Sequence, residues 1–159
     1  MRKAQDVTVV QTKVKNLITG KIIYQTFHKG DTFEDAAIEK FDVKFIYGRK
    51  GSYTFSDAND PSKRFELPEE QIGDGARFLK SNEVITGIKF KGETVNIIFP
   101  VKVQLRVKDA PPGVQGDRSQ GGTKTITLET GATLNVPLFV QTDDVVEVNT
   151  ETGEYVRRV

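Results

Sequence analysis

Short runs of alternating apolar and polar residues, broken by turn sequences, dominate this chain of 159 residues. In the clearest run, Phe41, Val43, Phe45 and Tyr47 fall on one face of an extended strand, and charged side chains fall on the other. Alternation with a period of two is typical of half-buried β-strands. Further strands are predicted at residues 7–17, 21–24, 52–55, 84–90, 95–99, 101–108, 125–128, 133–140, 145–149 and 154–158.

One segment departs from this pattern. Residues 67–80 begin with a proline and two glutamates, end with a lysine, and place Ile72, Ala76 and Leu79 on a common helical face. Acidic residues at the start and a basic residue at the end suit the dipole of a helix. The sequence therefore predicts a single short helix, which its two glycines weaken by about 1 kcal/mol each.

Many short strands, one helix and frequent turns predict small β-barrels rather than one large sheet. The length fits two tandem five-stranded barrels of the OB-like kind, with a boundary near residues 99–101. We therefore expect an all-β protein with a middle barrel at residues 30–99 and a C-terminal barrel at residues 100–159. Residues 1–29 are too short to close a barrel. OB surfaces commonly bind oligonucleotides, although this step is an analogy between folds.

The chain has no cysteine, which excludes disulfides and thiolate metal sites and fits a reducing compartment. Its N-terminus lacks the apolar segment of a secretory signal, and no uninterrupted apolar stretch reaches the roughly 18 residues of a membrane span. We therefore expect a cytoplasmic protein that does not contact a membrane.

The net charge of +1 hides an uneven distribution. Residues 1–29 carry six lysines and arginines against one acidic residue, whereas the rest of the chain carries 17 against 21. A basic edge on an otherwise acidic body can favour a polyanion. Lysines also protect an edge strand from pairing with other chains. Charge alone leaves both interpretations open.

Residues suited to catalysis or metal binding are sparse. His28 is the single histidine, and no serine near it lies in a nucleophile motif. The acidic pairs at residues 69–70 and 143–144 fit a helix start and a turn. Residues 57–60 resemble the start of a calcium loop, but the required glycine is missing and Pro68 stands where the last ligand belongs. We expect no enzyme activity, no catalytic residue, no metal and no cofactor.

A polar loop at residues 113–124, with the sequence GVQGDRSQGGTK, lies between rigid β-segments. Loops held in this way often carry binding sites. The loop nearly matches a phosphate-cradling motif, but Gly122 replaces its lysine and a strand follows in place of a helix, so an NTPase is excluded. The glycines could serve the turn alone. The charged residues beside them favour a contact with RNA by the set Gly116, Asp117, Arg118, Gly121 and Lys124.

These residues, together with others along the chain, resemble bacterial translation elongation factor P, and the resemblance covers essentially the whole chain. Residues 12–20 resemble the end of the first domain of this family, and residues 66–74 resemble the helix of its middle domain. The C-terminal domain is matched by Gly116–Arg118, Gly121–Lys124, Leu128–Ala132, Val136–Phe139 and Thr152–Val156.

The resemblance implies a non-catalytic factor, expected to be a monomer, that binds the 70S ribosome beside peptidyl-tRNA and promotes peptide-bond formation at consecutive prolines. It implies that residues 1–29 are the last strands of a partial SH3-like N-terminal domain. It places Lys13 and Lys15 against tRNA and the loop at residues 116–118 near the exit-site codon of the mRNA. Tyr155 and Arg158 match positions that support binding in the family.

The sequence departs from the family at four places, one of which is Asp143 in the position of a common turn glycine. It has no Pro-Gly-Lys-Gly loop, whose lysine reaches the peptidyl-transfer centre in the family, so we expect a truncated fragment, a misplaced start or a natural short form that is inactive alone. Arg118 stands in the family's threonine position, which retains affinity for RNA but alters codon-edge hydrogen bonding. Thr125 and Ile126 replace a Pro-Ala pair. The alternatives are an elongation-factor-P-like paralogue or another β-barrel module that binds RNA or protein, and an enzyme is a third class.

Overall fold

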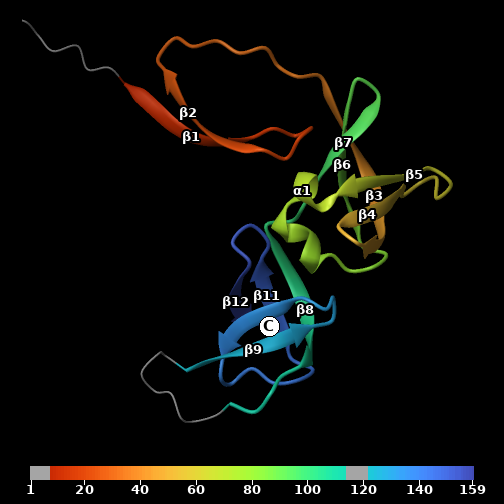
Figure 1. Cartoon of the computed structure of the whole chain (residues 1–159), viewed down its shortest axis with the longest axis vertical. Helices are drawn as coiled ribbons and strands as arrows, with labels where there is room; N and C mark the ends of the chain where they lie inside the picture. The colour runs from red at the N-terminus through yellow and green to blue at the C-terminus, as the bar shows by residue number, and fades with distance from the viewer. Residues whose placement is uncertain (1–7, 114–121) are drawn as a thin grey trace, which may run out of the picture.

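The computed structural model describes residues 8–113 and 122–159. Its strands form a two-stranded hairpin and two five-stranded sheets, in all of which neighbouring strands are antiparallel. Figure 1 shows these three parts in chain order, with the hairpin in red and orange and the C-terminal sheet in shades from teal to dark blue. Both five-stranded sheets curl until they nearly close, so the prediction of an all-β protein built from small barrels is confirmed.

The hairpin consists of β1 (Val9–Lys15) and β2 (Ile22–His28). Its turn is organised by Asn16, whose side-chain oxygen accepts hydrogen bonds from the backbone N–H groups of Ile18 and Thr19 at 2.9 and 3.0 Å. Gly20 completes the turn with a φ of 73°. Residues 29–37 are exposed and connect the hairpin to the middle sheet (Figure 1).

The middle sheet has the strand order β5-β4-β3-β6-β7. The short helix α1 (Glu69–Ile72) contacts both edge strands, β5 and β7, and so covers the gap between the sheet's edges. Two tight turns, at Lys50-Gly51 and Lys91-Gly92, have positive φ at both residues, which matches the twist of the strands they join. The strands are β3 (Ile38–Arg49), β4 (Ser52–Asp57), β5 (Arg64–Pro68), β6 (Val84–Phe90) and β7 (Glu93–Ile98).

The C-terminal sheet has the strand order β10-β9-β8-β11-β12. Its two edge strands, β10 and β12, contact each other, which brings this sheet close to a closed barrel. Closure removes exposed sheet edges that could pair with other chains. The strands are β8 (Lys102–Asp109), β9 (Thr123–Leu128), β10 (Thr133–Pro137), β11 (Val145–Asn149) and β12 (Glu154–Arg158).

The prediction of one helix over residues 67–80 is wrong. Leu67 and Pro68 end the strand β5, which the sequence analysis missed, and α1 lasts only four residues. Gly73 follows with a φ of 91°, which stops the helix, and a 3₁₀ turn, η1 (Asp74–Phe78), takes its place. The apolar residues expected on one helical face, Ile72, Ala76 and Leu79, are nevertheless all buried in the middle core.

Tyr47 also departs from the prediction. Val43 and Phe45 are buried as expected, but the pairing of β3 with β4 shifts between Phe45 and Tyr47. Such a β-bulge inserts an extra residue and breaks the alternation of faces. Tyr47 is therefore 49% exposed instead of lying in the core beside Phe45.

Phe78 links the two sheets. It is 1% exposed and belongs to the core of the C-terminal sheet, although its neighbours Ala76 and Leu79 pack in the middle core. Around it, the guanidinium of Arg77 lies 4.7 Å from the centre of the Phe78 ring, and Lys80 forms a 3.0 Å ion pair with Glu129. The 3₁₀ turn η1 is thus shared between two cores.

A second contact joins the sheets at the connection between β7 and β8. The hydroxyl of Thr150 donates a 2.7 Å hydrogen bond to the carbonyl of Pro100. Gly75 lies so close to Phe99 that a Cβ there would come within 3.2 Å of its ring.

The division into domains at residues 29 and 99 stays a prediction. Neither α1 nor η1, the helical segments of residues 8–113 and 122–159, is long and apolar enough to cross a membrane.

The shared core contact predicts a large effect of Phe78→Ala. Removing a buried phenylalanine ring costs about 3–5 kcal/mol of unfolding free energy, because burial and packing are lost together. Phe33→Ala is the matched control, since Phe33 is 69% exposed and contacts Phe27 in a T-shaped arrangement of the two rings. Urea denaturation measures both. Equal losses in the two variants would contradict the role assigned to Phe78.

Candidate nucleic-acid interface

The base of the polar loop is held at both ends. On one side Lys124 donates a hydrogen bond from its Nζ to the carbonyl of Pro111 at 3.0 Å. On the other, Leu138 packs between Gly113 and Gly122, where an added Cβ would come within 3.1 Å of its side chain in each case. Gly122 has a φ of 60°, a conformation that glycine adopts without strain.

Most of the RNA-contact residues predicted in the polar loop lie outside the described part of the chain. Gly116, Asp117, Arg118 and Gly121 are outside the described residues, so their contact with RNA stays a prediction. Lys124 is half-buried in β9, and one of its three N–H donors holds Pro111. Lys124 therefore closes the loop base, and its contact with RNA stays a prediction.

The two lysines predicted on one face of the first strand have different surroundings. Lys13 is exposed, whereas Lys15 donates a 3.0 Å hydrogen bond from its Nζ to the carbonyl of Ile72 in α1. Partial burial of this ammonium lowers the pKa of Lys15. Both side chains line a cavity of about 690 Å³ that the hairpin shares with α1 and with the turn after β11. Lys15 therefore ties the hairpin to the middle sheet.

Further contacts seat the hairpin turn on the middle sheet. Asn96, which is 1% exposed, donates hydrogen bonds to the carbonyls of Leu17 at 2.9 Å and Gln71 at 3.2 Å. Gly20 packs so closely on α1 that an added Cβ would collide with the carbonyl of Glu70. The basic face of the hairpin is therefore held at one end by backbone and side-chain contacts.

Tyr155 and Arg158 lie on β12. A bulge between β11 and β12 makes Val148 the partner of Tyr155 and Val146 the partner of Arg158. Residues three apart on a regular strand lie on opposite faces, but this bulge brings the pair to the same one. Tyr155 is half-buried against the C-terminal core, and Arg158 pairs with Asp144 at 3.4 Å.

Tyr155 also lines a groove of about 630 Å³ between β9, β10 and β12. Hydroxyl, amide and guanidinium groups line this groove, a chemistry suited to hydrogen bonds with a polar ligand. They come from Thr123, Thr125, Asn135 and Arg77. The predicted site residues that the structure describes thus lie in three places: the hairpin, the loop base and β12.

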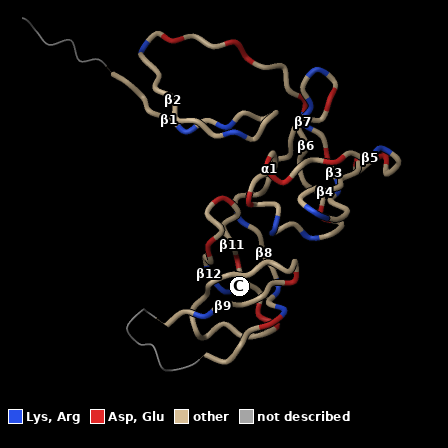
Figure 2. The backbone as a smooth tube through the Cα atoms, in the orientation of Figure 1, with Lys and Arg blue, Asp and Glu red and all other residues tan. Residues whose placement is uncertain are grey.

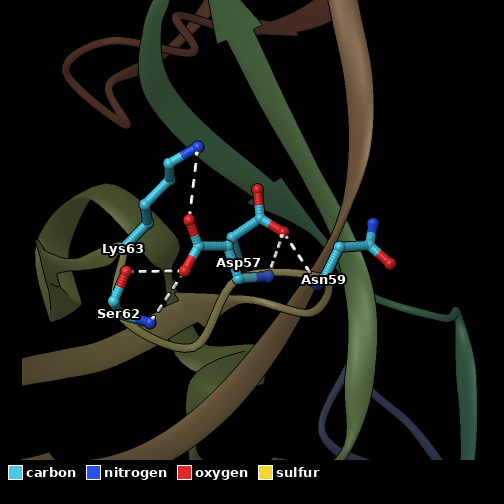
Figure 3. Close-up of polar contacts among 5 residues, drawn as sticks. Asp57, Asn59, Ser62 and Lys63 are labelled. Carbon is cyan, nitrogen blue, oxygen red and sulfur yellow. Dashed lines mark hydrogen bonds and ion pairs between the residues drawn. The ribbon is translucent and has the colours of Figure 1, made fainter.

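In the acidic loop at residues 57–60, which resembles the start of a calcium site, the carboxylates accept hydrogen bonds from nearby backbone N–H groups. In Figure 3, Asp57 accepts hydrogen bonds from the N–H groups of Asn59 and Asp60 at 2.8 and 3.2 Å. Asp60 in turn accepts bonds from the N–H and hydroxyl of Ser62, at 3.2 and 2.5 Å, and pairs with Lys63 at 3.5 Å. Hydrogen bonds from Ser62 lower the pKa of Asp60. These contacts build a turn.

The other acidic and histidine candidates also have local partners. His28 is exposed, and its backbone N–H donates to Asp31 at 2.7 Å. Glu69 and Glu70 occupy the first turn of α1, as expected from the helix dipole. Asp143 adopts a φ of 70° in a turn, which confirms the turn predicted there. Among residues 8–113 and 122–159, no cluster of three or more histidine or acidic side chains could hold a metal ion.

The fold defines a protein assembled from small β-barrels, and comparison with known proteins identifies the family. One family model, "Elongation factor P, C-terminal", matches residues 103–158, and another, "Elongation factor P (EF-P) KOW-like domain", matches residues 4–33. Elongation factor P of Moorella thermoacetica is 40% identical over 149 residues, which cover 94% of this chain and 80% of that protein.

Two further relatives give the same result. Elongation factor P of Corynebacterium efficiens is 42% identical over 150 residues, covering 94% of this chain and 80% of that protein. Elongation factor P of Thermodesulfovibrio yellowstonii is 36% identical over 159 residues, covering 100% and 84%. The chain therefore belongs to the elongation factor P family and is a translation elongation factor, as the sequence motifs predicted.

Three residues that organise the site escaped the sequence analysis. Phe78 lies off the helical face formed by its neighbours, and this mismatch was the available signal for a second packing partner. The packing of Gly20 on α1 and the hydrogen bonds of Asn96 gave no signal, because each depends on a partner far away in the chain.

The tether formed by Lys15 predicts a local effect on the hairpin. Lys15→Met keeps most of the aliphatic stem but removes the hydrogen bond to Ile72, which is worth about 1 kcal/mol. Amide hydrogen exchange in β1 is expected to accelerate by up to about fivefold. Lys13→Met, two residues away on the same face, is the control. Equal acceleration in both variants would show that the tether does not hold the hairpin.

Proposed function

We propose that this chain acts on the 70S ribosome beside peptidyl-tRNA and takes part in peptide-bond formation at consecutive prolines. The observation that carries the proposal is the identity of about 40% to elongation factors P over 94% of the chain. The family implies an interaction with the ribosome. We further propose that the factor works as a monomer in the cytoplasm, without catalysis of its own, and that its domains divide near residues 29 and 99.

The basic hairpin supports a contact with tRNA. Residues 8–29 contain four lysines and no acidic residue, so this hairpin presents only positive charge. Lys13 is exposed, and within the described residues it forms no ion pair, which leaves its ammonium available to a phosphate. Lys15 contributes charge from the same face while it holds the hairpin in place.

The clamped loop base supports a contact with mRNA. Lys124 and Leu138 fix the two ends of the segment that carries Gly116, Asp117 and Arg118. We propose that this segment approaches the exit-site codon, with Arg118 on a phosphate or a base. On β12, the half-buried Tyr155 and the exposed Arg158 add a further contact.

Co-sedimentation with ribosomes at graded salt tests this proposal. Arg118→Ala is expected to weaken binding by about 1–3 kcal/mol if the contact is bidentate, with little change in the melting temperature. Arg64→Ala on β5 is the matched control, since Arg64 is exposed and lies on the other sheet. If the unaltered chain stays away from ribosomes in a lysate gradient, another RNA or protein partner is favoured.

A triple-proline message in reconstituted translation tests the second half of the proposal. The 159 residues contain no Pro-Gly-Lys-Gly sequence, the loop that enters the peptidyl-transfer centre in the family. A protein made of these residues alone is expected to bind ribosomes without relieving the stall. Full relief would show that stall release does not require that loop.

A further inference from the structure

A cleft of about 670 Å³ lies where the middle sheet meets the C-terminal sheet. One wall is the β3–β4 turn together with η1, and the opposite wall is the turn between β9 and β10, at Glu129 and Thr130. The volume falls within the range of roughly 300–1,000 Å³ found for small-molecule pockets. Among the residues that the structure describes, none of those assigned above to ribosome, tRNA or mRNA contacts lines this cleft.

Two tyrosines, together with the buried Phe45, form the aromatic part of the cleft. Tyr47 is 49% exposed because the bulge in β3 turns it out of the core. Tyr53 packs against Gly48, where an added Cβ would come within 2.8 Å of its ring. Burial, and then the negative charge of Glu69, raises the pKa of Tyr53, so its hydroxyl keeps its proton and can donate a hydrogen bond.

The rim of the cleft is basic. Arg49 ends β3 and Lys50 lies on the following turn, and Arg77 and Lys80 come from η1 and the residues after it. Figure 2 shows blue segments where the middle sheet faces the C-terminal sheet. Among the described residues, Glu129 is the one acidic residue of the lining; it is paired with Lys80 at 3.0 Å and accepts the N–H of Arg106 at 2.8 Å.

The pairing of Glu129 with Lys80 leaves the lining of the cleft with an excess of positive charge. Burial acts to raise the pKa of Glu129, but the hydrogen bonds from Arg106 and Lys80 outweigh it and lower the pKa. Glu129 is therefore ionised and cancels Lys80. Within the described residues, Arg49 and Lys50 form no ion pair and remain available to an anion.

We propose that this cleft binds an unstacked nucleotide of single-stranded RNA, with its base on Tyr47 and its flanking phosphates on Arg49 and Lys50. Proteins that bind single strands combine a basic groove with aromatic side chains on which bases stack. An acidic peptide would use the cations but gain nothing from an exposed aromatic face. The inference goes beyond the proposed function, because it concerns a separate surface and does not require the ribosome.

Fluorescence anisotropy with a labelled, unstructured RNA nonamer tests the proposal. An abasic strand of the same length and charge serves as the second probe, since it keeps the phosphates and lacks the bases. Tyr47→Ala is expected to raise the Kd for the RNA nonamer about tenfold and to leave the Kd for the abasic strand unchanged. Tyr47→Phe retains the ring and is expected to restore binding to the unaltered level.

The chain offers a matched pair for the charge contribution. Lys50-Gly51 and Lys91-Gly92 are equivalent turns of the same sheet, and both lysines have a φ of 52°. Asparagine tolerates this conformation, so Lys50→Asn and Lys91→Asn change the charge with little strain. Lys50→Asn is expected to lower the salt dependence of RNA binding by about 0.7 in the log–log slope. Lys91→Asn is expected to leave it unchanged.

Three results would overturn the proposal. Tyr47→Ala could weaken both strands equally, or Lys50→Asn and Lys91→Asn could act alike, and either result would show that the RNA does not occupy the cleft. If Tyr47→Ala and Lys50→Asn affect a fluorescent polyglutamate peptide and not the RNA, an acidic protein segment is the ligand. If the protein still co-sediments with ribosomes when any of these results is obtained, the proposed function is retained and only the assignment of the cleft is rejected.

Discussion

The burial of Phe78 in the C-terminal core fixes how the two five-stranded sheets face each other. Ala76 and Leu79, on either side of it, pack in the middle core, so a single 3₁₀ turn is committed to both. A relative movement of the sheets would have to pull the Phe78 ring out of one core or its neighbours out of the other. Complete burial of a side chain of this size is worth about 1.5–3 kcal/mol, which opposes such movement.

Two of the surfaces with RNA-binding chemistry, the basic cleft and the groove beside Tyr155, depend on this arrangement. The basic cleft exists only because Arg49 and Lys50 face Glu129 and Thr130 across the contact that Phe78 maintains. The groove beside Tyr155 includes Arg77, the residue immediately before Phe78. Holding such groups at fixed positions before binding reduces the entropy lost when an RNA contacts them.

The hairpin at the N-terminal end of the described chain is also held in a fixed position before any RNA binds. Lys15, Gly20 and Asn96 hold its turn against α1 and β7, so the exposed lysine on its face has a defined position relative to the middle sheet. The anchors are mostly contacts with backbone carbonyls, which constrain position more closely than apolar packing does, because hydrogen bonds depend on direction.

Regular elements could be predicted from the sequence, whereas contacts between distant segments could not. The bounds of β6, β11 and β12 agree with the prediction, because alternation and turn residues mark both of their ends. The prediction of a single helix was wrong because Gly73 adopts a positive φ and ends the helix there. The predicted burial of Tyr47 was wrong because a β-bulge leaves no signal in the alternation of apolar and polar residues. The double use of Phe78 depends on the C-terminal sheet, which no local pattern around residue 78 describes. Motifs identified the family, but the anchoring role of Lys15 required its partner in α1.

The distance between the two sheets in solution tests the central claim most directly. The chain has no cysteine, so spin labels can be placed selectively through Glu93→Cys on β7 and Thr133→Cys on β10, both exposed positions. Electron–electron double resonance on the folded protein should then give one narrow distance distribution. The same label pair in a Phe78→Ala background, with both sheets still folded by circular dichroism, should give a broad one. A broad distribution in the unaltered protein, or an unchanged narrow one without the Phe78 ring, would contradict the account.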